Sequence, residues 1–125
     1  MPIVQMPHSE RVVVLRCHGE YGIEDVMENI ASAPGAGLAD SISIIFDVRD
    51  SKSPRSRDDF RRMVRKLGED NRYAVRHASV INLDDQLYFG LTRQIQAMAD
   101  NKGIDYGLFG SIEEAVEFVS SAETN

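Results

Sequence analysis

The stretch that decides the fold is residues 42–48, which read Ile-Ser-Ile-Ile-Phe-Asp-Val. It is apolar and rich in β-branched residues, with little alternation between apolar and polar positions. Such a run is typical of a strand that other elements cover on both faces, as in a parallel sheet between helices. The polar residues 49–55 follow it and predict a loop.

Amphipathic helices are expected on both sides of this strand. Apolar residues recur there at the i, i+3, i+4, i+7 spacing of a helix that buries one face. They are Ile23, Val26, Met27 and Ile30 before the strand, and Phe60, Met63, Val64 and Leu67 after it. Gly22 is the expected N-cap of the first helix, and Ser56, with Asp59 three residues on, is that of the second.

The outer segments continue an alternation of strands and helices. Strands are expected at residues 3–6, 11–17, 74–83 and 104–109, and helices with apolar stripes at Leu87, Leu91, Ile95, Met98 and at Ile112, Ala115, Val116, Val119. Pro2 and Pro7 bracket the first strand, which suits a sheet edge. Asp84 is the expected N-cap of the third helix, and Ser111 with Glu114 forms a capping box for the fourth.

This order, β-β-α-β-α-β-α-β-α, predicts an α/β fold. We expect a mixed, mostly parallel sheet of about five strands with four helices. The 125 residues are predicted to form one domain, residues 1–125, with a frayed tail at 121–125.

Composition excludes several classes of protein. The chain is 42% apolar and 27% charged, which is typical of a globular domain rather than a disordered one. It has no apolar run of the ~20 residues that span a bilayer and no visible signal peptide. One cysteine, Cys17, fits a reducing compartment, so a cytoplasmic location is expected. The net charge of −6 argues against nucleic-acid binding.

The basic residues are concentrated in one part of the chain. Residues 49–76 hold ten of the 14 Lys and Arg. One interpretation is a solvated helix face. The other is a docking surface for an acidic protein partner, because clustered arginines bind carboxylates and phosphates bidentately. The candidate partner-binding residues are Arg55, Arg57, Arg61, Arg62 and Arg65.

Four stretches together resemble the STAS superfamily, which includes anti-sigma-factor antagonists, and its bacterial stand-alone STAS/Sec14-like branch. They are RVVVLRCHGEYGIEDV (11–26), SISIIFDVRD (41–50), ASVINLDDQLYFGLTRQIQAMA (78–99) and LFGSIEEAVEFV (108–119). The resemblance implies a STAS-like sheet and a regulatory, protein-binding function without enzymatic activity. We also expect the chain to form a homodimer.

In phospho-switched members of that superfamily, a serine at the start of the second helix is phosphorylated by the partner kinase. The equivalent stretch here, residues 50–58, lacks the Ser-Ser-Gly pattern of those proteins. Ser56 lies nearest the equivalent position and Ser53 is next. A phosphate at a helix N-terminus beside Arg55 and Arg57 would be stabilised, but a plain N-cap explains Ser56 equally well.

Aromatic residues gather in the last third of the chain. Tyr88, Phe89, Tyr106 and Phe109 form either part of the core or an apolar pocket or interface. Phe89 lies off the helix stripe and is the aromatic most expected to be exposed. Because Sec14-like relatives carry hydrophobic ligands, the alternative function is binding of an apolar small molecule or lipid near Tyr88 and Phe89.

Catalytic and metal sites have weak support in the sequence. His8, His18 and His77 with Cys17 do not follow recognised zinc spacings. Asp47 and Asp50 lie at the end of a central strand, where open α/β sheets bind ligands, and His18 follows another strand end. No nucleophile elbow, P-loop or dinucleotide fingerprint accompanies them. We therefore expect no enzyme, no metal and no cofactor.

Overall fold

The structure is a computed structural model that describes residues 2–33, 41–52, 56–69 and 73–121. Five strands and four helices alternate in the predicted order: β1 (Ile3–Pro7), β2 (Val12–Gly19), α1 (Ile23–Ser32), β3 (Ser43–Ser51), α2 (Arg57–Glu69), β4 (Arg76–Val80), α3 (Gln86–Asn101), β5 (Asp105–Phe109) and α4 (Ile112–Ser121). The prediction of a mixed α/β fold is confirmed.

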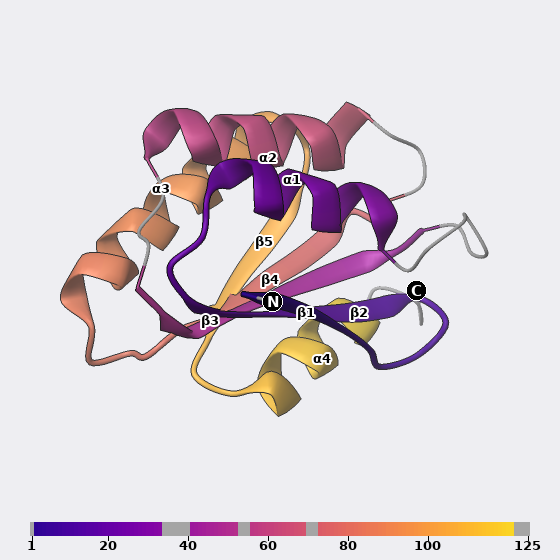
Figure 1. Cartoon of the computed structure of the whole chain (residues 1–125). Helices are drawn as coiled ribbons and strands as arrows, with labels where there is room; N and C mark the ends of the chain where they lie inside the picture. The colour runs from indigo at the N-terminus through magenta and orange to yellow at the C-terminus, as the bar shows by residue number, and fades with distance from the viewer. Residues whose placement is uncertain (1, 34–40, 53–55, 70–72, 122–125) are drawn as a thin grey trace.

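The strands form one sheet in the order β1-β2-β3-β4-β5. β1 pairs antiparallel with β2, and the other neighbouring pairs are parallel. In Figure 1, α1, α2 and α3 cover one face of this sheet and α4 lies alone on the other. The expected antiparallel hairpin at one edge and the parallel remainder are both present.

A separate apolar core lies on each face of the sheet. Because β2 lies between these two cores, its apolar residues do not alternate with polar ones. Val13, Leu15 and Cys17 belong to the core beneath α1, α2 and α3, while Val12 and Val14 belong to the core against α4. Successive side chains of a strand point to opposite faces, so a strand covered on both faces needs apolar residues throughout. β3 follows the same rule, since Ile44 and Ile45 are both 0% exposed.

A buried histidine, His77 of β4, forms a hydrogen bond to the backbone of β3. The backbone N–H of Ile44 donates to Nδ1 of His77 over 3.0 Å, and Nε2 of His77 lies 2.8 Å from the carbonyl oxygen of Ala74. Because Nδ1 accepts a hydrogen bond, the ring proton sits on Nε2 and is donated to Ala74. Burial lowers the pKa of His77 to about 4, so the ring stays neutral.

Several boundaries differ from the prediction, among them those of β3, β4 and α3. β3 continues to Ser51, where a loop was expected from Arg49, because Asp50 and Ser51 pair with β2 beyond an irregularity in the register. β4 is shorter than the predicted strand at 74–83. α3 begins at Gln86, so Asp85 rather than Asp84 directly precedes it, and the Asp85 carbonyl accepts from the N–H of Phe89.

Candidate functional site

The basic residues of the predicted docking segment lie on the outer face of α2. Phe60, Met63, Val64 and Leu67 are at most 5% exposed and face the sheet. Arg61, Arg62 and Arg65 fall between them and are exposed. The helical spacing predicted this division, because residues three and four apart share one face.

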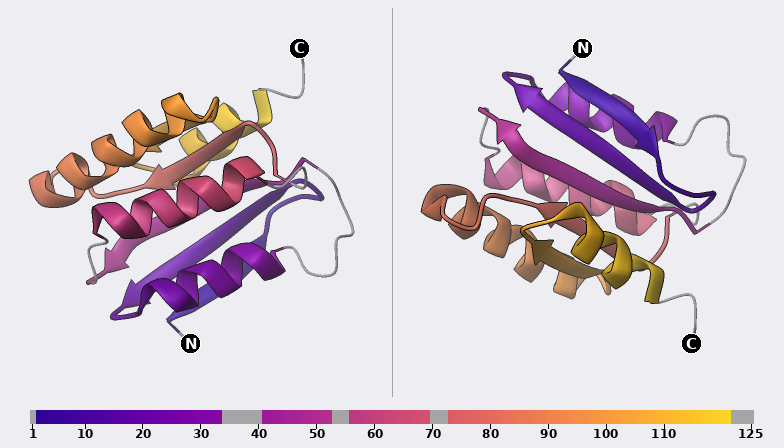
Figure 2. Two further views of the ribbon diagram at one scale, coloured as in Figure 1. Left: turned by 90° about the horizontal axis from the view of Figure 1, so that it is seen from above. Right: turned by 90° about the horizontal axis from the view of Figure 1, so that it is seen from below.

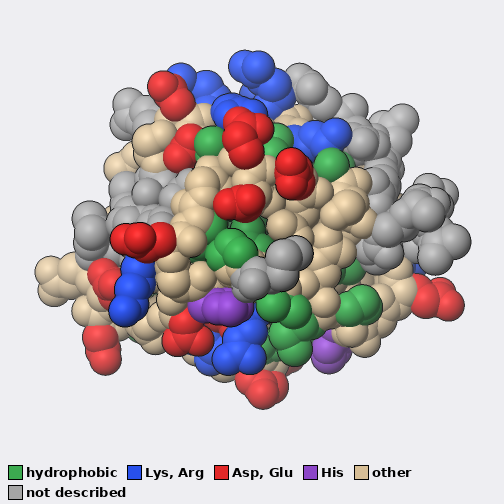
Figure 3. Space-filling model, in the orientation of Figure 1, with side chains coloured by type: hydrophobic (Ala, Val, Ile, Leu, Met, Phe, Trp, Pro, Cys, Tyr) green, Lys and Arg blue, Asp and Glu red, His purple; other side chains and the backbone are tan. Residues whose placement is uncertain are grey.

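α2 occupies the centre of the helix layer. Seen from above, it runs between α1 and α3 (Figure 2, left). In Figure 3, Lys and Arg side chains gather along the upper edge of the molecule over α2, with acidic side chains beneath them. The outer face of α2, which we call the α2 face, is therefore a basic surface on an acidic protein.

Arg61 and Arg62 take part in ion pairs. Arg61 Nη1 lies 2.9 Å from Asp58 Oδ1 within α2, and Arg62 Nη1 lies 2.9 Å from Glu24 Oε1 of α1. All four side chains are about half exposed or more. Exposed pairs of this kind contribute between ~0 and ~1 kcal/mol, so the arginines can exchange these partners for others.

Ser56 is the N-cap of α2. The N–H of Asp59 donates to Ser56 Oγ over 3.1 Å, and the N–H of Ser56 donates to Asp59 Oδ2 over 3.3 Å. This is the reciprocal capping arrangement that the sequence predicted. A phosphate on Ser56 would meet the Asp59 carboxylate, and the hydroxyl already serves as a cap. Ser53, Arg55 and the Arg57 side chain lie outside the described residues.

The predicted aromatic cluster is divided between different surroundings. Tyr106 is 4% exposed beneath α1, α2 and α3, and its hydroxyl lies 2.7 Å from Ser79 Oγ. Burial raises the pKa of the Tyr106 hydroxyl. Phe109 packs on the other face of the sheet, against Phe118 of α4, with ring centroids 5.3 Å apart. Tyr106 and Phe109 therefore belong to the cores on opposite faces of the sheet, which is the first of the two alternatives, and share no pocket among the described residues.

The physical reason is the alternation of side chains along a strand. Tyr106 and Phe109 are three residues apart in β5, an odd spacing that sends them to opposite faces. Phe89, as expected, is exposed, at 37%, and the Arg93 guanidinium lies 5.9 Å from its ring centroid. The side chain of Tyr88 lies outside the described residues.

A small interior cavity lies beneath the helix layer, where sequence reasoning placed none. Its volume is about 30 Å³, and Cys17, Phe46, Phe60, Ser79 and Tyr106 are among its lining residues. This volume is close to that of one water molecule. Only the tertiary packing of four strands and three helices creates it, so no local sequence signal could have found it.

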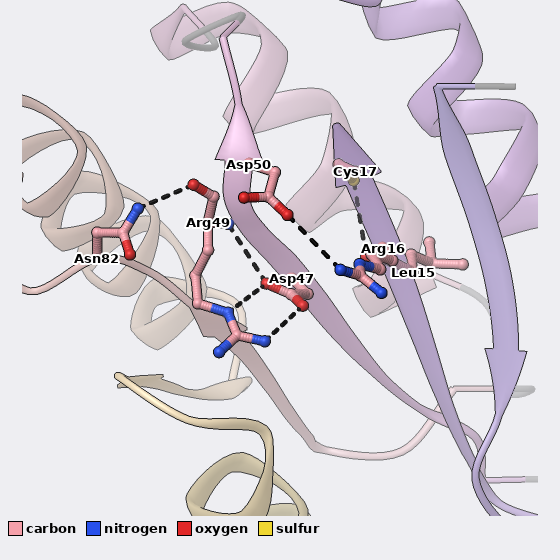
Figure 4. A network of polar contacts seen from close by, with 7 residues as sticks. All are labelled: Leu15, Arg16, Cys17, Asp47, Arg49, Asp50 and Asn82. Atoms are coloured by element: carbon pink, nitrogen blue, oxygen red, sulfur yellow. Dashed lines mark hydrogen bonds and ion pairs between the residues drawn. The ribbon is translucent and has the colours of Figure 1, made fainter. Parts of the chain in front are cut away.

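A polar network lies at the carboxyl ends of β2 and β3 (Figure 4). Asp47 is 3% exposed, and Arg49 Nε and Nη2 donate to its two carboxylate oxygens, each over 2.9 Å. This hydrogen bonding raises the pKa of Arg49. Asn82 Nδ2 donates to the Arg49 carbonyl over 2.8 Å, and Arg16 lies 3.7 Å from Asp50.

This network has little capacity for acid–base chemistry. Both oxygens of Asp47 already accept hydrogen bonds from the Arg49 side chain. His18 and Asp50 border a hollow with Val4, Met6 and Arg16, but it is open to solvent rather than enclosed. Sequence reasoning missed Arg49 because it ended the strand at Val48. Because the strand continues past Val48, the side chains of residues 47 and 49 point to the same face of the sheet.

The part of the chain that the structure describes contains no group of three or more His, Cys, Asp and Glu side chains able to hold a metal ion. None of its helices is long and apolar enough to cross a membrane.

Comparison with known proteins identifies the fold. No family model and no curated protein matches this sequence. A crystal structure of an uncharacterized protein of the DUF3478 family from Shewanella loihica PV-4, described as having a SpoIIAA-like fold, is similar. The TM-score is 0.62 with 14% identity, over 94% of this chain and 91% of that chain. The chain therefore has a SpoIIAA-like fold.

Proposed function

We propose that this chain is a cytoplasmic, non-enzymatic regulatory module that binds an acidic partner protein through the α2 face. The observation that carries the proposal is the position of Arg61, Arg62 and Arg65 on the exposed side of the central helix. The side of α2 that packs on the sheet is apolar, so these cations take no part in the core. The resemblance to anti-sigma-factor antagonists, which act by binding proteins, supports the same function.

Charge reversal on the α2 face tests this proposal. The double variant Arg61→Glu/Arg62→Glu should reduce recovery of the partner from the cells that make this protein by about tenfold or more, since like charges then oppose docking. Its free energy of unfolding should stay within about 1 kcal/mol of the wild type, because both ion pairs are exposed. Arg11→Glu/Lys52→Glu makes the same change of net charge away from α2 and should bind normally. Equal recovery with both variants would contradict the proposal.

A second candidate function is binding of an apolar small molecule. The interior cavity favours it, because its walls are almost entirely apolar and the Tyr106 and Ser79 hydroxyls offer a polar end. A lipid is far larger than about 30 Å³, so the helix layer would have to open to admit one. Native mass spectrometry of the purified protein tests this candidate. A spectrum of bare protein, with no stabilisation by added amphiphiles, would contradict it.

We also expect two copies of the chain to associate. The edge strand β1 carries no charged residue, and its Val4 and Met6 side chains are 41% and 42% exposed. Uncharged edges of this kind favour association. Sedimentation velocity over a range of concentrations measures this, and a monomer mass throughout would contradict the expectation.

A further inference from the structure

The two sides of α2 differ in a way that suggests where a partner binds. Between α1 and α2 lies a hollow of about 190 Å³, lined by Met27, Arg62, Arg65 and Lys66. Between α2 and α3 lies a larger one of about 310 Å³, lined by Arg61, Val64, Arg65, Met98, Asn101 and Lys102. We call the larger hollow the α2–α3 groove.

The α2–α3 groove combines an apolar bottom with a basic rim. Val64 is 2% exposed and Met98 is partly buried against the core. Arg61, Arg65 and Lys102 are all exposed and contribute three cations around these two side chains. Methionine adapts readily to different apolar shapes, and arginine binds carboxylates bidentately.

Both hollows are lined by three basic side chains, so their apolar linings rather than their charges separate them. On the α1 side, the Glu24 carboxylate already pairs with Arg62. Lys102 is the third cation on the α3 side, as Lys66 is on the α1 side. The Asp58 carboxylate that pairs with Arg61 is 84% exposed, so a carboxylate from a partner can replace it at little cost. The α2–α3 groove therefore offers an acidic ligand as many cations as its neighbour, together with a larger volume and two apolar lining residues, Val64 and Met98, instead of one.

Resting on the proposed function, we infer that the α2–α3 groove binds an acidic segment of the partner protein that inserts one apolar side chain between Val64 and Met98. A membrane surface fits this shape less well. Membrane-binding surfaces present protruding apolar side chains that insert into lipid, whereas the apolar groups here lie at the bottom of a hollow.

Methyl NMR spectra with a defined probe test the inference. The probe is a short peptide of Glu and Asp residues with one central Leu, titrated to about 1 mM, a concentration that detects weak binding. The Met98 methyl signal should shift, and the Met27 methyl signal, from the other hollow, should remain in place. A matched peptide with Ala in place of Leu should bind about fivefold more weakly, because it loses the buried anchor.

Variants of the full chain complete the test. Lys102→Glu should weaken binding of the Leu peptide about fivefold or more, whereas Lys52→Glu, with the same change of charge elsewhere, should change it less than about twofold. Equal effects of the two variants, a shift of Met27 alone, or no binding of the Leu peptide would overturn the inference. Loss of partner recovery in Arg61→Glu/Arg62→Glu would still uphold the proposed function in each case. Binding to phosphatidylglycerol vesicles, weakened by Lys102→Glu and without peptide binding, would assign the groove to membranes instead.

Discussion

At the scale of single residues, His77 makes stability depend on pH. Its pKa is about 4 in the folded chain and close to 6.5 in the unfolded chain, so the unfolded state binds more protons between these values. The stabilisation is therefore complete above pH 6.5 and is lost as the pH falls toward 4. From pH 7.5 to pH 5 we expect a loss of about 2 kcal/mol in the free energy of unfolding.

Urea denaturation at both pH values measures this loss, with His77→Gln as the reference variant. The glutamine amide can accept from Ile44 and donate to Ala74 without titrating. The stability of the wild type relative to His77→Gln should fall by about the same 2 kcal/mol between pH 7.5 and pH 5. An identical pH dependence in both proteins would show that His77 does not titrate as described.

The pair of Asp47 and Arg49 is the second feature at this scale. Arg49→Ala leaves a buried carboxylate without its main partner and should lower the free energy of unfolding by about 2 kcal/mol. Arg16→Ala breaks only the exposed 3.7 Å pair with Asp50 and should cost less than about 0.5 kcal/mol. Chemical denaturation of the two variants compares these costs. Equal costs would mean that the buried pair of Asp47 and Arg49 contributes no more to stability than the exposed pair of Arg16 and Asp50.

At the scale of elements, the start of α2 depends on one side chain. Ser56→Ala removes the hydroxyl that accepts from the N–H of Asp59 and should cost about 1 kcal/mol. Ser56→Asp keeps an N-cap and should remain close to the wild type. Thermal unfolding followed by circular dichroism distinguishes the two variants. Destabilisation by Ser56→Asp and not by Ser56→Ala would contradict the capping role.

The elements also show what the sequence could and could not reveal. The spacing of Phe60, Met63, Val64 and Leu67 predicted both the buried side of α2 and the exposure of its arginines, because one helical period governs both. The alternation of side chains along β5 could have predicted that Tyr106 and Phe109 lie on opposite faces of the sheet. The extension of β3 to Ser51 was not predictable, because polar residues there pair with β2 through the backbone. The α2–α3 groove depends on how two helices pack, which no local pattern encodes.

At the scale of the whole molecule, the helix layer gives the domain two different sides. Three helices cover one face of the sheet, and the central one presents arginines to solvent, while α4 alone covers the other face. A chain with a net charge of −6 attracts an acidic partner only where its cations are concentrated. We therefore expect partner contacts on the side of α2 and not on the side of α4.

Photo-crosslinking in the cells that make the protein tests this claim most directly. A photoreactive amino acid at position 65, on the α2 face, should give a covalent adduct with the partner protein. The same amino acid at position 117, in place of the exposed Glu117 of α4, should give none. Adducts from position 117 alone, or from neither position, would contradict the assignment of the α2 face as the binding surface.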